Sequence, residues 1–207
     1  MIHLVSRIGI IALLVVSTMT ASAQATGPVE IIRNTTATLF ELVNDNRSAY
    51  ESDPTRLRCD IRDILLAQID VVYSGRLVLG RSGRGLSRDK VVEFSNALSD
   101  LLIGRYADGL LEFQTRDQVE ILPLAGDNTE RMTRVRTRVH LDNGEQAPVD
   151  YVFRFAEGQW KIFDVIVEGI SYVATFRNQI SEEIRSTGFD ATLERLKRGE
   201  IEIEIDD

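Results

Sequence analysis

The sequence predicts an α+β fold: a curved antiparallel sheet of about four strands, wrapped by N-terminal and C-terminal helices around an apolar cavity. Three observations lead to this prediction. Apolar residues recur at helical spacing in three stretches between residues 28 and 111. From about 113 to 168 the pattern alternates with a period of two, which is typical of strands. Helical spacing then returns between 170 and 186.

Residues 1–23 have the pattern of a secretory signal peptide. A weakly basic start and a short apolar stretch over 8–16 precede an A-x-A cleavage pattern that ends at Ala23. The apolar stretch is too short for a membrane-spanning helix. We therefore expect an exported mature protein that forms a single domain over residues 24–207; the alternative is an uncleaved N-terminal anchor.

The composition is that of a globular protein, with 43% hydrophobic and 27% charged residues. The formal net charge is −8, and loss of Arg7 with the signal peptide makes it more negative by one. An acidic protein is a poor candidate for binding nucleic acid, and its overall charge does not favour an anionic membrane surface.

Two amphipathic helices are expected after the signal peptide. The first begins at Pro28 and runs to about Arg47. The second has Asp53 as its N-cap and Pro54 at its first helical position. Cys59, the single cysteine, lies on this helix, so no internal disulfide is possible. We expect a small helical residue there; the alternative is a reactive or intermolecular thiol.

The stretch 74–87 is the most glycine-rich in the chain, and we expect a loop or short insertion there. Its glycines do not form G-x-G-x-x-G or a Walker motif, so a nucleotide site is not predicted. The stretch also holds Arg76, Arg81 and Arg84. These arginines either meet a lipid phosphate or an acidic partner, or they lie on a solvated loop.

A long helix and the strands of the sheet follow. Ser87 is the expected N-cap of a helix that runs to about Leu111. The strands are expected at about 113–123, 130–141, 147–156 and 159–168, with hairpin turns at 142–144 and 157–158.

Alternation along these strands predicts one apolar and one basic face of the sheet. The apolar face of the second strand carries Val135, Thr137, Val139 and Leu141, and its basic face carries Arg134, Arg136, Arg138 and His140. The apolar face of the third strand carries Val149, Tyr151, Phe153 and Phe155. We expect the basic face to pair in solvent with acids such as Glu120 and Asp150; the alternative is docking to a partner.

The last strand leads into the closing helices. Nearly every residue from Trp160 to Val167 is bulky, aromatic or β-branched, so this strand is expected to be covered on both faces. Gly169 breaks the run, and an amphipathic helix is expected over 170–186, ended by Gly188. A short last helix follows, and the C-terminal tail either adds an edge strand or frays.

Residues between 149 and 190 form a distinctive series. Its members are Val149, Asp150, Tyr151, Trp160, Lys161, Asp164, Val165, Val167, Glu168, Gly169, Ser171, Phe176, Arg177, Gln179, Gly188, Phe189 and Asp190. This series resembles the WKVYDV-VEGVS-YR-Q-G-D pattern of the MlaC family, periplasmic phospholipid carriers also known as toluene-tolerance auxiliary components of an ABC lipid transporter. The family usually has a WR-type step before the long helix. Arg84 matches its arginine, but the tryptophan is absent here.

The resemblance implies a carrier that is not an enzyme and needs neither metal nor cofactor. It would shuttle phospholipid between outer-membrane and inner-membrane complexes, and so maintain outer-membrane lipid asymmetry. The implied partners are phospholipid, an inner-membrane ABC transporter with its membrane-anchored substrate-binding subunit, and an outer-membrane lipoprotein–porin complex. The implied location is the periplasm.

A phospholipid carrier needs a deep apolar pocket, since exposing two acyl chains of about 15 methylenes each to water costs about 24 kcal/mol. The expected lining residues are Leu98, Leu102, Val135, Val139, Tyr151, Phe153, Val165, Val167, Ile170 and Val173. Arg76, Arg84 and Arg177 are expected to contact the head group or a docking partner. Either Val139→Trp or Val167→Trp is expected to fill the pocket and lower the lipid content.

Two other classes of function remain open. A periplasmic module that binds a small hydrophobic ligand or acts as a chaperone would show the same apolar faces. A cavity enzyme of the isomerase type would need a lone base, for which Asp164 and Glu168 are candidates. Both acids are otherwise expected to join Arg177 in a polar network at the strand-to-helix junction. His140 is the single histidine of the mature chain, so neither a His-based metal cluster nor a Ser-His-Asp triad is expected.

Overall fold

The computed structural model describes residues 25–112, 116–126, 128–141 and 143–202. The predicted signal peptide lies outside these residues, as does the tail beyond Glu202. Ile201 and Glu202, the described start of the tail, belong to no strand, and Ile201 is buried.

The chain folds into six α-helices, three short 3-10 helices and one sheet in its described part. The elements are α1 (Pro28–Ser52), α2 (Pro54–Leu66), α3 (Val71–Leu79), η1 (Gly80–Gly83), α4 (Arg88–Tyr106), η2 (Ala107–Glu112), η3 (Arg116–Gln118), β1 (Val119–Ile121), β2 (Met132–His140), β3 (Gln146–Ala156), β4 (Gln159–Val167), β5 (Ile170–Ser171), α5 (Tyr172–Thr187) and α6 (Phe189–Lys197). The five strands are antiparallel and follow one another in chain order, and the sheet is open. The α+β prediction is therefore confirmed.

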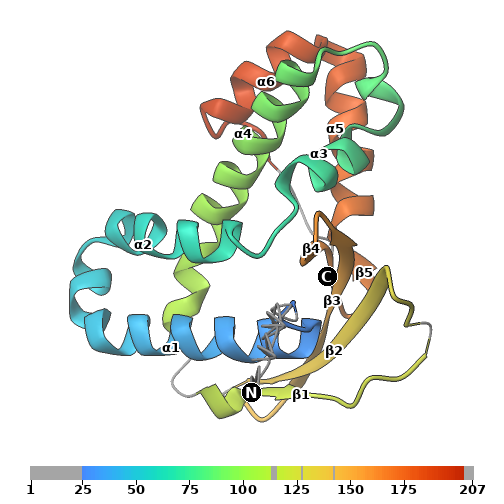
Figure 1. The fold of residues 1–207 in the computed structure, drawn as a ribbon. Coiled ribbons are helices and arrows are strands. Elements are labelled where there is room, and N and C mark those ends of the chain that lie inside the picture. The colour runs from blue at the N-terminus through green and yellow to red at the C-terminus, as the bar shows by residue number, and fades with distance from the viewer. Residues whose placement is uncertain (1–24, 113–115, 127, 142, 203–207) are drawn as a thin grey trace, which may run out of the picture.

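The elements form two halves joined by α4 (Figure 1). Helices α3, α5 and α6 pack with the upper part of α4 into a bundle, while α1, α2 and the sheet make up the lower half. The bundle has its own buried cluster, which includes Phe94 of α4 and Ile180 of α5. A second cluster joins Ile31 and Ile32 of α1 to Phe153 of the sheet. The two halves therefore have separate buried clusters.

The faces of β2 agree with the predicted alternation. Val135, Thr137 and Val139 are buried, whereas the intervening residues reach solvent. On the basic face, Nε of Arg134 donates to Oδ2 of Asp150 at 2.7 Å, and Arg138 lies 4.0 Å from Glu120. The predicted pairing of this face with acids is confirmed.

The predicted loop at 74–87 is wrong for residues 74–79, which belong to the helix α3, whereas residues 84–87 lie in no helix or strand. Asp70 caps this helix by accepting a hydrogen bond from the backbone N–H of Tyr73. Val78 and Leu79 are almost fully buried in the bundle, which stabilises a helix that Gly75 disfavours. Gly75 was an indicator of a loop in the sequence, but it serves packing: a Cβ atom there would lie 2.0 Å from Oγ of Ser95 on α4.

Other boundaries and faces also differ from prediction. The strand expected at 113–123 is reduced to β1, because 3-10 helices occupy the residues described on its N-terminal side. Leu141 and Phe155, expected on the apolar face, are 40% and 39% exposed at strand ends. Ile170, expected at the start of the helix, lies in β5, where it pairs with Val167 of β4, and it is 37% exposed.

Candidate functional site

The first apolar pocket lies where α3, α4 and α5 meet β4, and its volume is about 140 Å³. Its lining is mostly aliphatic and aromatic. The residues are Leu66, Ile69, Val71, Ser74, Gly75, Val78, Ser95, Leu98, Ser99, Leu102, Ile103, Ile162, Phe163, Asp164, Val165, Tyr172, Val173 and Phe176. The pocket therefore lies at the boundary between the helical bundle and the sheet.

The second apolar pocket lies between α1, η2 and the first three strands, and its volume is about 240 Å³. Its lining residues are Thr36, Leu39, Phe40, Val43, Leu110, Val119, Val139, Val149 and Tyr151. Burial raises the pKa of Tyr151 to about 12. The phenol is thus neutral at physiological pH, and none of the described lining residues of this pocket is charged.

The ten predicted lining residues fall into three groups. Leu98, Leu102, Val165 and Val173 line the first pocket, and Val139 and Tyr151 line the second. Val135 and Phe153 are fully buried in the core between α1 and the sheet. Val167 and Ile170 line neither apolar pocket. Which of them touch a lipid stays a prediction.

The contribution of α3 to the first pocket was not predicted from the sequence. Residues 74–87 were expected to form a loop, and a loop has no helical face that could be assigned to a pocket. Val71, Ser74, Gly75 and Val78 recur at spacings of three and four along α3 and all face this pocket. The hydrophobic run Val71–Val72 directly after Asp70 was the available signal for the helix start.

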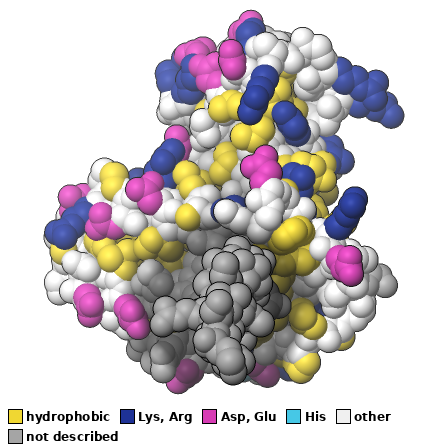
Figure 2. Space-filling model, viewed as in Figure 1, with side chains coloured by type: hydrophobic (Ala, Val, Ile, Leu, Met, Phe, Trp, Pro, Cys, Tyr) yellow, Lys and Arg dark blue, Asp and Glu magenta, His cyan; other side chains and the backbone are white. Residues whose placement is uncertain are grey.

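Figure 2 shows that apolar side chains gather on the face of the bundle and along the rim of the lower half. They lie on both sides of the grey atoms, which are not described. The apolar surface of this face therefore spans both halves of the molecule rather than one element.

Polar contacts fix α3 to the sheet beside the first pocket. Nη1 of Arg154 donates to Oδ2 of Asp70 at 2.7 Å, and its guanidinium lies over the ring of Tyr73 at 4.0 Å. The hydroxyl of Ser74 donates to the carbonyl oxygen of Phe163 at 2.9 Å. These contacts position one wall of the pocket.

Asp164 of β4 fixes the start of α5 to that strand. Its Oδ2 accepts from the hydroxyl of Ser171, the N-cap of α5, at 2.6 Å, and its Oδ1 accepts from the backbone N–H of Val173 at 3.0 Å. Glu168 is exposed in the turn after β4, and Arg177 donates instead to the carbonyl oxygen of Leu77. Of the three residues expected in a junction network, only Asp164 contacts the junction in the described structure.

We expect Asp164→Ala to lower the free energy of unfolding by about 1–2 kcal/mol, because both contacts to the start of α5 are lost. Asp164→Asn should cost less, since the amide oxygen can still accept from Val173. Glu168→Ala is the control, being an exposed acid four residues along the chain, and should change the free energy by less than about 0.5 kcal/mol. Urea unfolding followed by circular dichroism measures all three; equal effects of the two alanine variants would contradict the capping role.

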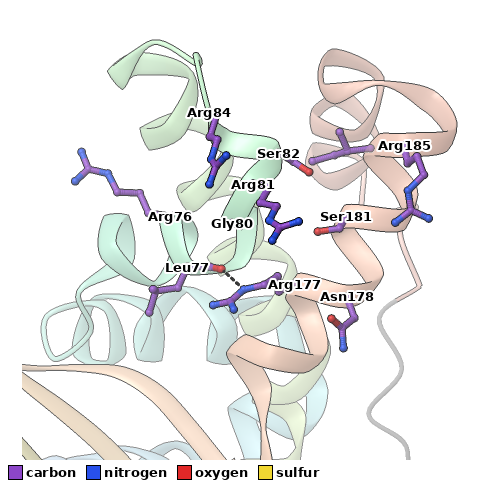
Figure 3. Close-up of a pocket in the computed structure, with 11 residues that line it drawn as sticks. Arg76, Leu77, Gly80, Arg81, Ser82, Arg84, Arg177, Asn178, Ser181 and Arg185 are labelled. Atoms are coloured by element: carbon purple, nitrogen blue, oxygen red, sulfur yellow. Dashed lines mark hydrogen bonds between the residues drawn. The ribbon is translucent and has the colours of Figure 1, made fainter.

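A third hollow lies on the outer side of the α3–α5 pair and is basic. Its volume is about 670 Å³, and we call it the arginine hollow (Figure 3). Its lining residues are Arg76, Leu77, Gly80, Arg81, Ser82, Arg84, Arg177, Asn178, Ser181, Ile184 and Arg185. The predicted contacts of a head group or partner, Arg76, Arg84 and Arg177, thus come together in one place.

No group of three or more His, Cys, Asp or Glu residues suited to a metal ion occurs in the described part of the chain. Among the described helices, none is both long and apolar enough to cross a membrane. Cys59 is exposed on α2.

Two relatives of known name match most of the chain. The chain is 26% identical over 187 residues to the intermembrane phospholipid transport system binding protein MlaC of Haemophilus influenzae, covering 87% of this chain and 85% of that protein. It is also 26% identical over 191 residues to the toluene tolerance protein ttg2D of Pseudomonas putida, covering 92% and 87% of the two chains.

A solved structure with the same fold is the phospholipid-binding protein of Ralstonia solanacearum, which was determined in complex with a phospholipid. The TM-score is 0.74 at 17% sequence identity, over 84% of this chain and 97% of that one. The family model described as "MlaC protein" matches residues 33–198, which span most of the helices and the whole sheet. The chain therefore belongs to the MlaC family.

Proposed function

We propose that this protein is a periplasmic phospholipid carrier, which shuttles lipid between outer-membrane and inner-membrane complexes and so maintains outer-membrane lipid asymmetry. The observation that carries the proposal is the pair of apolar pockets at the boundaries of the helices and the sheet. Relatives named for phospholipid transport and phospholipid binding support the choice of cargo.

The pocket volumes indicate how the cargo enters. Two acyl chains of about 15 methylenes each need about 900 Å³, if a methylene occupies roughly the 30 Å³ of a water molecule in the liquid. The two apolar pockets have about 140 and 240 Å³. The cargo therefore needs more room than the two pockets have, and we propose that the bundle parts from the sheet on loading, which enlarges the first pocket between them.

The same geometry favours a carrier over an enzyme. A carrier has to keep apolar surface away from water and needs no reacting group in its pocket. Asp164 is the one acid among the described lining residues of the first pocket, and both of its carboxylate oxygens already accept hydrogen bonds from the start of α5. The partners we propose are phospholipid, the inner-membrane ABC transporter complex with its substrate-binding subunit, and the outer-membrane lipoprotein–porin complex.

Native mass spectrometry tests the proposal most directly. The mature chain, residues 24–207, purified without detergent from a Gram-negative periplasm, should carry a mass excess of one or two phospholipids that is lost on denaturation. A bare polypeptide mass, together with failure to bind added phospholipid, would contradict the carrier function. A smaller bound mass would instead favour a module for small hydrophobic ligands, to which pockets of this size also correspond.

A further inference from the structure

The arginine hollow concentrates positive charge in a protein that is acidic overall. Its described lining holds five arginines and no acidic residue, whereas the chain has a formal net charge of −8. None of these five arginines forms an ion pair among the described residues, although many other arginines of the fold do. Like charges in one hollow repel one another, so this arrangement is more favourable when an anion is bound.

The donors of the hollow suit a phosphate group better than a carboxylate. A guanidinium has a planar set of N–H donors that binds phosphate oxygens in pairs. A carboxylate has two oxygens to offer, whereas a phosphate group exposes more oxygens and can be contacted by several arginines at once. The hydroxyls of Ser82 and Ser181 and the amide of Asn178 supply further neutral donors in the same hollow.

Contacts between segments far apart in the sequence hold the two walls of the hollow in place. Nε of Arg177 on α5 donates to the carbonyl oxygen of Leu77 on α3 at 2.6 Å. Gly80 allows this close packing, because a Cβ atom there would lie 3.3 Å from Cδ of Arg177. Figure 3 shows Arg81 extending from η1 toward α5, and Arg177 extending from α5 toward α3. The basic groups thus come from both walls of a formed site.

The hollow is separate from the apolar pockets. It shares no lining residue with either of them. On α3, Arg76 and Leu77 face the hollow from the side of the helix opposite to the residues that face the first pocket. Val78, Leu79 and Phe176 are buried in the bundle core beside these walls. A phosphate in the hollow therefore belongs to a molecule other than a lipid whose chains fill the first pocket.

We propose that the arginine hollow is a binding site for a phosphate group, distinct from the site of the acyl chains. The phosphate comes either from the head group of an anionic phospholipid in a membrane surface or from free phosphate. In the first case the hollow gives an acidic carrier a local attachment point on a surface that its overall charge disfavours. The proposal rests on the carrier function only in naming a phospholipid as one source of the phosphate.

The test uses the mature protein, its Arg81→Gln/Arg84→Gln variant and a control variant, Arg33→Gln/Arg131→Gln. Arg33 and Arg131 are exposed and lie outside the hollow, so both variants change the net charge equally. Binding is measured at low ionic strength to vesicles of phosphatidylglycerol and phosphatidylcholine in equal parts, to vesicles of phosphatidylcholine alone, and by calorimetry to inorganic phosphate.

We expect the wild type to bind the anionic vesicles or inorganic phosphate, and whichever is bound tightly identifies the source. The Arg81→Gln/Arg84→Gln variant should bind about 25-fold more weakly, at about fivefold for each arginine near the surface. The control variant should bind as the wild type does. Equal losses of binding in both variants would overturn the proposal. So would a wild type that binds neither phosphate source, including one that binds an acidic peptide such as polyglutamate instead.

Co-purified phospholipid, measured by native mass spectrometry on the same variants, separates this proposal from the carrier function. Unchanged lipid in the Arg81→Gln/Arg84→Gln variant supports two distinct sites. Loss of that lipid in a folded variant would mean that the hollow holds the head group of the cargo, and would overturn the separation. A wild type that carries no lipid but binds phosphate would contradict the carrier function alone.

Discussion

Val165→Trp is expected to remove most of the phospholipid that co-purifies with this protein. Val165 lies on β4, is half-buried and lines the first apolar pocket. An indole there would take up much of a volume of about 140 Å³. That volume corresponds to about five methylenes at roughly 30 Å³ each. Excluding them costs about 4 kcal/mol, or several hundredfold in affinity.

The matched control is Val167→Trp, two residues further along the same strand. Val167 has the same side chain and is also half-buried, but it lines neither apolar pocket. The structure thus changes the result expected for this substitution, which the sequence alone suggested would block the lipid. Native mass spectrometry should show lipid in Val167→Trp and little in Val165→Trp, with circular dichroism to establish that both fold. Equal lipid in the two variants would show that the first pocket does not hold acyl chains.

The contrast between Val165 and Val167 shows how far alternation along a strand can lead. Both residues lie on one face of β4, opposite Tyr151 and Val149 of β3, as the period of two predicts. Which of them meets a pocket depends on the elements packed opposite, and these come from α4 and α5. A side chain in a filled core and one in a cavity have the same sequence pattern, so Val135 and Phe153 were predicted to line a cavity although they are buried in the core.

The arginine hollow was only partly predictable for a similar reason. The charge of Arg76, Arg84 and Arg177 can be read from the sequence, and so can the absence of a nucleotide-binding motif around them. Their proximity depends on the packing of α3 against α5, which are separated by about a hundred residues, as in the hydrogen bond from Arg177 to Leu77. Arg185 was not singled out, since one more basic residue in the last turn of a helix is ordinary.

The resemblance of residues 149–190 to the family was more informative than periodicity about function, and less informative about structure. It led to the family that the match over residues 33–198 supports. It gave no sign that the segment around Gly75 is a helix, because the similar residues lie almost entirely outside that segment. There the local signals for a loop, several glycines close together, were outweighed by burial of Val78 and Leu79.

Gly75→Ala is expected to destabilise the bundle by about 2 kcal/mol, although alanine is normally the better helix former. The added Cβ would lie 2.0 Å from Oγ, 2.7 Å from Cβ and 3.0 Å from Cα of Ser95. Because the last of these is a backbone atom, a change of rotamer cannot relieve the overlap and α3 must move away from α4. Overpacking of this kind costs about 3 kcal/mol, and the helix preference of alanine returns about 1 kcal/mol.

Gly104→Ala provides the control, since Gly104 also lies within a helix, α4, and a Cβ atom there would have nothing within 4 Å. That variant should be about 1 kcal/mol more stable than the wild type. In urea unfolding, Gly75→Ala should be about 2 kcal/mol less stable than the wild type and Gly104→Ala about 1 kcal/mol more stable, so the two variants differ by about 3 kcal/mol. A Gly75→Ala protein as stable as Gly104→Ala would contradict the close approach of α3 to α4.

A second substitution identifies the contact itself. Ser95→Gly removes the Oγ and Cβ atoms that the new methyl group would meet, at the cost of the hydrogen bond from Ser95 to the carbonyl oxygen of Val91. In Gly75→Ala/Ser95→Gly we expect the two effects to cancel in part, with a favourable coupling of at least about 1 kcal/mol. Both residues line the first apolar pocket. If Gly75→Ala also loses lipid and the double variant recovers both stability and lipid, the spacing of α3 and α4 sets the shape of the lipid site.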